Sequence, residues 1–309
     1  MSQKRKDNDE EAGSNKRFKD TEHILGEGSN GRICMVEHNN TFVAVKTFPN
    51  LKGMTLVEEY GEAAIQAELT ELAKKENFNF ILRLVGEGAV PSTVYTEKLF
   101  MEVGQCSLHD IIHSKRCRFN KPEEVCRQYL LPIALAVQFM HKHEIVHLDL
   151  KPGNIIVVNR VLKVADFGSA IKMVGNQNRI DKEYNATTFI YATPEYFADE
   201  DYDPYAVDLW SLGIMLFEML TVSYPWEKPV DGDEWFLAWK NDNTANNWNF
   251  LKRKAPETHA YLCEHMLHLD PKLRSSVGDI IQFCLKKPSP PPSVSTESNV
   301  DLACSEKSL

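Results

Sequence analysis

The chain lacks several features that would assign it to a simple class. No apolar run is long enough to span a bilayer, and the polar N-terminus is unlike a secretory signal. The seven cysteines include no Cys-x-x-Cys pair, which favours reduced thiols in the cytoplasm or nucleus over a disulfide or zinc framework. The net charge of −9 is the opposite of the basic excess typical of nucleic-acid-binding proteins. We therefore expect no membrane partner and no nucleic-acid partner.

The length and composition favour a globular body between two tails. At 309 residues and 43% hydrophobic content, the chain is long for one core and suits two lobes that share a cleft. Residues 1–20 are charged and nearly free of large apolar side chains, and residues 286–309 are rich in Pro and Ser, so we expect two disordered tails. Basic clusters at 4–6 and 16–19 are consistent with a two-part nuclear import signal or with an ordinary solvated tail.

The most informative stretch is 147–168, in which two polar clusters flank two short apolar runs. It reads His-Leu-Asp-Leu-Lys-Pro-Gly-Asn, then 155–165, then Asp-Phe-Gly. Asn159-Arg160 separates the apolar runs where a hairpin would turn. Such a hairpin would hold the polar clusters side by side. The side chains brought together would be Asp149, Lys151, Asn154 and Asp166.

These groups suit phosphoryl transfer. A carboxylate and an amide offer the hard oxygen ligands that Mg²⁺ prefers. A second carboxylate suits an incoming hydroxyl, and an amine suits a phosphoryl group in transfer. A single buried Asp is more often a helix cap, but two complete motifs at hairpin spacing argue against that interpretation. The pattern resembles the catalytic loop and the Asp-Phe-Gly motif of eukaryotic protein kinases.

A glycine-rich loop near the N-terminus supports the same resemblance. The glycines of 26–31 allow a tight hairpin whose backbone approaches phosphates closely. Strand-like residues 33–36 follow, rather than the helix that a dinucleotide-binding fold requires. Lys46 ends the apolar strand 42–46. A lysine in such a run normally snorkels to solvent, but after a glycine loop we expect it to reach ATP phosphates.

The resemblance implies an α+β, two-lobed protein-kinase-like fold over 21–285. The small β-rich lobe would cover about 21–102, and the larger, mainly helical lobe about 105–285. A helix is predicted at 55–75, because Ile65, Leu69 and Leu72 fall on one face. This helix should supply the glutamate that pairs with Lys46. We expect Glu68 in that role, with Glu62 as the alternative.

The resemblance also implies ATP and Mg²⁺ as cofactors. Asp149 would be the catalytic base, Lys151 would stabilise the γ-phosphoryl group, and Asn154 and Asp166 would hold Mg²⁺. Met101 would lie at the back of the adenine pocket, and Ile156 would cover the ring. The expected nucleotide-binding residues are Gly26, Glu27, Gly28, Ser29, Asn30, Gly31, Ile33, Ala44, Lys46, Glu68 and Met101, together with backbone groups of Glu102 and Val103.

Motifs in the second half extend the resemblance to the serine/threonine branch. Thr193-Pro194-Glu195 stands where this family has Ala-Pro-Glu, and Arg274 is the expected partner of Glu195. Asp208 would support the catalytic-loop backbone, and Thr188 would bridge the catalytic Asp and Lys. Residues 224–229, 239–240 and 247–248 are also similar to checkpoint kinase one. Four tryptophans in 226–248 either pack inside the lower lobe, which we favour, or form a docking patch.

The substrate implied is a protein bearing Ser or Thr, and the oligomeric state stays open. Leu148 replaces the Arg that usually precedes the catalytic Asp, so we expect activity without a phosphate on the activation segment. A pseudokinase or scaffold is the main alternative, because Asn30 at the glycine-loop tip and the long interval from Lys46 to Glu68 are unusual. A small-molecule kinase is a weaker alternative.

Overall fold

The computed structural model describes nine segments of the chain. Both predicted tails, apart from Lys286, lie outside them, as do Ser29, Asn30 and Thr187. The described segments are residues 23–28, 31–38, 40–47, 61–85, 98–114, 121–173, 188–198, 202–241 and 246–286.

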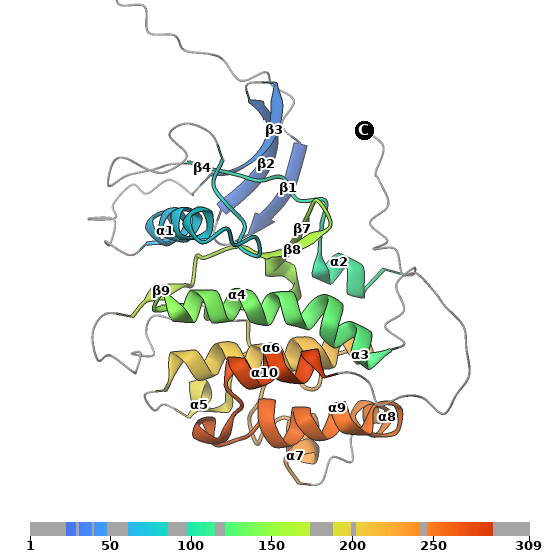
Figure 1. The fold of residues 1–309 in the computed structure, drawn as a ribbon. Helices are drawn as coiled ribbons and strands as arrows, with labels where there is room; N and C mark the ends of the chain where they lie inside the picture. The colour runs from blue at the N-terminus through green and yellow to red at the C-terminus, as the bar shows by residue number, and fades with distance from the viewer. Residues whose placement is uncertain are drawn as a thin grey trace, which may run out of the picture.

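The first lobe is an antiparallel sheet with one helix beside it (Figure 1). Its strands, in the order β1-β2-β3-β4, are β1 (His23–Gly28), β2 (Gly31–His38), β3 (Thr41–Thr47) and β4 (Lys98–Met101). Gly31 has a φ of 123°, a conformation that favours glycine, at the β1–β2 turn. The register pairs Lys46 with Ile33 and with Leu99, and Ala44 with Met101. The sheet thus sets Lys46 beside the strand that follows the glycine loop.

The helix α1 (Glu62–Lys75) lies within the predicted 55–75, of which 55–60 is outside the described residues. Ile65 and Leu69 are buried as the periodicity predicts. After this helix, two isolated bridges join Ile81 to Val164 and Leu84 to Met101.

The second lobe is mainly helical (Figure 1). Strand β5 (Cys106–Ser107) pairs with β7 (Ile155–Val158), which forms a hairpin with β8 (Val161–Val164). Strand β6 (Ile145–Val146) pairs with β9 (Ile171–Lys172). Its helices are α2 (Leu108–Ile112), α3 (Pro122–Val125), α4 (Leu131–Lys142), α5 (Pro194–Phe197), α6 (Pro204–Thr221), α7 (Glu234–Lys240), α8 (Asn246–Lys254), α9 (Pro256–Tyr261) and α10 (Val277–Leu285). The predicted two-lobed α+β fold is confirmed.

The helical stretch from Pro122 to Lys142 contains a wider turn just before Pro132. A wider π-helical turn, Cys126–Leu130, separates α3 from α4. Proline has no N–H to donate, and its ring crowds the carbonyl four residues earlier, so the wider turn just before Pro132 relieves both conflicts.

The tryptophans mostly pack inside the second lobe. Trp226, Trp239 and Trp248 are buried, and Trp210 of α6 packs against the first two. Trp235 differs, because 52% of it is exposed. The interior packing that we favoured is therefore confirmed for three of the four. No helix among the described residues is long and apolar enough to cross a membrane.

Candidate active site

The predicted hairpin organises the site. Strands β7 (Ile155–Val158) and β8 (Val161–Val164) are antiparallel, and Asn159 and Arg160 turn between them with φ of 50° and 65°. Two successive left-handed residues give the turn whose twist suits a two-residue hairpin. Beyond the strands, the N–H of Ala165 donates to the carbonyl of Asn154 at 2.9 Å. The two polar loops therefore lie side by side.

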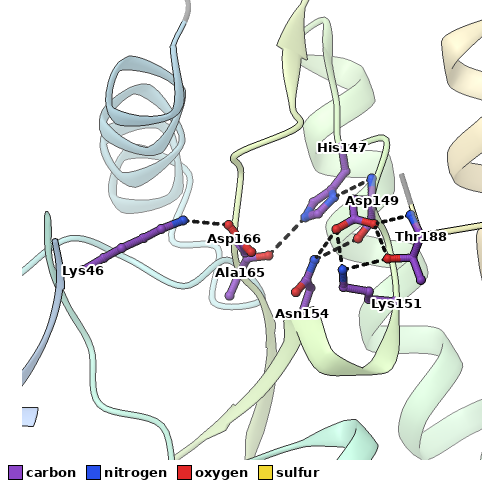
Figure 2. A network of polar contacts seen from close by, with 8 residues as sticks. All are labelled: Lys46, His147, Asp149, Lys151, Asn154, Ala165, Asp166 and Thr188. Atoms are coloured by element: carbon purple, nitrogen blue, oxygen red, sulfur yellow. Dashed lines mark hydrogen bonds and ion pairs between the residues drawn. The ribbon is translucent and has the colours of Figure 1, made fainter. Parts of the chain in front are cut away.

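The carboxylate of Asp149 contacts three neighbouring residues, Lys151, Asn154 and Thr188 (Figure 2). Lys151 Nζ donates to Asp149 Oδ2 at 2.7 Å, and also to Thr188 Oγ1 at 2.9 Å. Thr188 donates from its Oγ1 and its N–H to Asp149 Oδ1, at 3.0 and 3.2 Å. Asn154 Nδ2 donates to the Asp149 carbonyl at 2.9 Å. The carboxylate is thus fixed in position with an ammonium group beside it, and Thr188 makes the bridge that the resemblance implied.

The loop backbone is strained and is held from α6. Leu148 and Asp166 have φ of 65° and 59°, which is uncommon for residues other than glycine. The fully buried carboxylate of Asp208 accepts the N–H groups of His147 and Leu148, each at 2.9 Å, and contacts His141 Nε2 at 2.8 Å. Asp208 therefore stabilises the unusual conformation just before Asp149.

Lys46 joins the two lobes electrostatically. Its Nζ lies 2.5 Å from Glu62 Oε1 and 2.8 Å from Asp166 Oδ1. Burial alone would lower the pKa of Lys46, but the two carboxylates outweigh it and the pKa is raised. Burial likewise opposes ionisation of Asp166, but Lys46 outweighs it and holds the pKa of Asp166 below its usual value. Both groups therefore stay charged near neutral pH.

The expected pairing of Lys46 with Glu68 is wrong. Glu68 instead pairs with Lys172 of β9, and its side chain is 37% exposed, against 10% for Glu62. The two glutamates are six residues apart, so they point about a third of a turn away from each other around the helix. Glu62 is the first residue of α1 and contacts Lys46, whereas Glu68 lies in the following turn and contacts Lys172.

Asn154 and Asp166 fit the Mg²⁺ that the resemblance implies. The amide nitrogen of Asn154 already donates to Asp149, which leaves its amide oxygen as an acceptor. Asp166 adds an ionised carboxylate from the facing loop. A donor set of hard oxygens suits this ion.

The predicted adenine-lining residues form one apolar cluster. Ala44 and Met101 are buried in this cluster. Ile33, Val103 and Ile156 are partly buried and pack against it. Gly104 follows this group, and a Cβ atom at Gly104 would lie 2.1 Å from Ile156 Cγ2. Glycine is therefore required there for Ile156 to keep its place.

Glu102 has a contact that the sequence analysis missed. Both of its carboxylate oxygens lie 2.8 Å from Nζ of the buried Lys163, and Arg83 Nη2 donates to it at 3.1 Å. Burial raises the pKa of Glu102, but these donors outweigh it and the pKa is lowered. The Glu102 N–H donates to the Arg83 carbonyl, so only the Glu102 carbonyl can serve a nucleotide base. The signal in the sequence was the lysine between Leu162 and Val164 on an apolar strand, because a buried lysine needs an acidic partner.

The remaining predicted residues lie at the edges of the site. Gly26, Glu27, Gly28 and Gly31 form the facing ends of β1 and β2. Arg274 donates to Glu195 through both terminal nitrogens, at 2.5 and 2.8 Å, so the predicted pairing of these residues is confirmed.

A two-lobed fold with this hairpin, the aspartates Asp149 and Asp166 and the strand lysine Lys46 is typical of the protein-kinase fold. Comparison with known sequences agrees, because the family described as "Protein kinase domain" matches residues 19–285. The chain therefore belongs to the protein kinase family.

Among similar proteins, the serine/threonine-protein kinase PRR2 of Saccharomyces cerevisiae is 25% identical over 86% of this chain. The serine/threonine-protein kinase chk-1 of Caenorhabditis elegans is 34% identical over 72% of it, and SBK1 of Danio rerio is 28% identical over 83%. The matched parts span 42%, 44% and 65% of those three proteins. The chain thus corresponds to part of each relative.

Proposed function

We propose that the protein transfers the γ-phosphoryl group of ATP to serine or threonine hydroxyls of a protein substrate, with Mg²⁺ as cofactor. The observation that carries this proposal is the network of Figure 2, in which Asp149, Lys151, Asn154 and Thr188 contact one another. Asp166, from the facing loop, contacts Lys46. We also propose residence in the cytoplasm, the nucleus or both, on the cysteine usage and the basic N-terminal clusters.

Each group has a defined role in this mechanism. Lys46, held by Glu62, positions the α- and β-phosphates, and Lys151 stabilises the charge on the transferring group. Asp149 accepts or orients the proton of the substrate hydroxyl. Asn154 and Asp166 would hold Mg²⁺, which when bound neutralises phosphate charge. Little covalent chemistry is needed, so positioning and charge stabilisation supply the rate.

A pseudokinase or scaffold remains the competing function. One of the two reasons for considering it was the long interval from Lys46 to its glutamate. The partner is Glu62, only 16 residues from Lys46, so that reason no longer applies. Asn30, the other reason, lies outside the described residues.

The decisive experiment is transfer of labelled phosphate from ATP to a mixed protein substrate. We expect labelled phosphoserine or phosphothreonine with Mg²⁺ and none after chelation. The Asp166→Asn variant should lose this Mg²⁺-dependent transfer while keeping its fold, because Asn tolerates the left-handed backbone at that position. Nucleotide binding without transfer by the unmodified protein would instead support the scaffold.

Leu148 suggests that activity does not depend on activation-segment phosphorylation. It is buried with Val146, Met173, Tyr202 and Val207, so apolar packing occupies the place where the family's arginine meets a phosphate. We expect phosphatase-treated protein to keep kcat within about threefold of untreated protein, a difference of under about 1 kcal/mol in activation free energy. Intact-mass measurement would verify phosphate removal. A loss of tenfold or more, reversed by rephosphorylation, would contradict this expectation.

A further inference from the structure

Two helices of the second lobe bring together three metal-ligand side chains outside the phosphotransfer network. His109 lies on α2, His113 directly follows α2, and Glu218 lies on α6. His113 Nε2 is 3.0 Å from Glu218 Oε1, and His109 Nδ1 is 3.9 Å from the same oxygen. One ligand atom from each residue lies within 4.8 Å of the other two. The two imidazoles are four residues apart, the spacing that sets side chains on one face of a helix.

The carboxylate of Glu218 is unusual in its burial. It has no solvent exposure, and among the described residues its ion-pair partners are the two imidazoles and no lysine or arginine. Tyr191 Oη donates to its other oxygen, Oε2, at 2.5 Å. A buried carboxylate is costly unless a cation or donors compensate it; Tyr191 and Tyr224 both hydrogen-bond this one, and the two histidines lie beside Oε1.

The histidines connect this carboxylate to solvent. The side chain of His109 is 48% exposed and that of His113 is 34% exposed. A dissolved ion can therefore reach the imidazole nitrogens without opening the core, and the buried carboxylate lies next to them.

We propose that His109, His113 and Glu218 form a binding site for a divalent transition-metal ion of the Zn²⁺ class, with water as the fourth ligand. Two imidazoles and one carboxylate are a donor set typical of zinc with an open coordination position. Ca²⁺ and Mg²⁺ prefer all-oxygen sites and are not expected here. Metal–ligand bonds of about 2.0–2.1 Å at tetrahedral angles separate ligand atoms by about 3.4 Å. The two histidine–glutamate distances of 3.0 and 3.9 Å bracket that value, and the ligand nitrogens of the two histidines lie within 4.8 Å of each other.

The ion would connect the helices to the segment that reaches the catalytic base. Tyr191 contacts Glu218, and the N–H of Tyr191 donates to the carbonyl of Thr188 at 2.9 Å. A metal bound at Glu218 would therefore brace α2 and α6 against the segment that carries Thr188. The site is separate from the ATP-binding groups and does not depend on the proposed phosphotransfer.

The test is a zinc titration of the full chain after chelator treatment and dialysis, by calorimetry in excess Mg²⁺ so that oxygen-rich sites are saturated. We expect one zinc site that the double variant His109→Ala/His113→Ala weakens at least tenfold. The matched control is His265→Ala, which removes an exposed imidazole elsewhere and should leave the zinc affinity unchanged. Cobalt should give the visible absorption bands of a tetrahedral site in the unmodified and control proteins but not in the double variant.

A single variant and the contrary outcomes make the test decisive. The single variant His109→Ala changes only a half-exposed side chain and should fold, with intermediate zinc affinity and a smaller zinc-induced rise in melting temperature. Equal zinc affinity in the unmodified protein and the histidine variants, or cobalt spectra typical of thiolate ligands, would overturn the proposal and assign the metal to cysteines. Absence of zinc binding to the unmodified protein would also overturn it.

Discussion

Replacing Asp149 by Asn is expected to lower kcat by about 10²–10⁴-fold, the usual contribution of a positioned general base. The amide keeps the size of the carboxylate and one oxygen to accept the Thr188 hydrogen bonds. It cannot accept a proton from the substrate hydroxyl, and it removes the charge that holds Lys151 at 2.7 Å. Since Asp149 does not contact Lys46 or the adenine cluster, affinity for Mg-ATP should change little.

The measurement is kcat by phosphate transfer, with Mg-ATP affinity measured separately by calorimetry on the same samples. Asp231→Asn is a matched control, because that carboxylate is 68% exposed and pairs only with Lys240 at the surface among the described residues. Transfer within tenfold of the unmodified protein would exclude Asp149 as the base. Loss of nucleotide binding together with transfer would indicate a structural role.

Replacing Glu62 by Gln is expected to lower kcat/KM by about 10²-fold, the cost of displacing a positioning group by roughly 1 Å. The charge of Glu62 holds Lys46 at 2.5 Å in a buried setting. Once it is lost, Lys46 is free to move wholly to Asp166, which lies 2.8 Å away and is a proposed Mg²⁺ ligand. The expected signature is a raised KM for ATP together with a lowered kcat.

Glu68→Gln is the matched comparison, with the same chemical change on the same helix. Its side chain is 37% exposed and that of its partner Lys172 is 21% exposed, and ion pairs near the surface contribute about 0–1 kcal/mol. We expect kcat/KM within about threefold of the unmodified protein. A larger defect for Glu68→Gln than for Glu62→Gln would reverse the assignment made from the structure.

The sequence alone was sufficient for features whose interacting residues are also close together along the chain. The hairpin at Asn159-Arg160 follows from two apolar runs separated by turn residues, and it aligns the loops of Asp149 and Asp166. Its prediction needs no long-range information, because both strands are within ten residues of each other. The pairing of Glu195 with Arg274 was predictable only through ordered motifs that resemble a family.

Tertiary structure decided what depends on helix phase and on burial. Glu62 and Glu68 are the same residue type on one helix, and where α1 begins and how it rotates against the sheet selects Glu62 for Lys46. The register of distant strands likewise sets Lys163 against Glu102, and packing of α2 on α6 sets two histidines over Glu218. Sequence spacing specifies which groups share a local element, but partners across elements depend on rotations and separations that only the packed core determines.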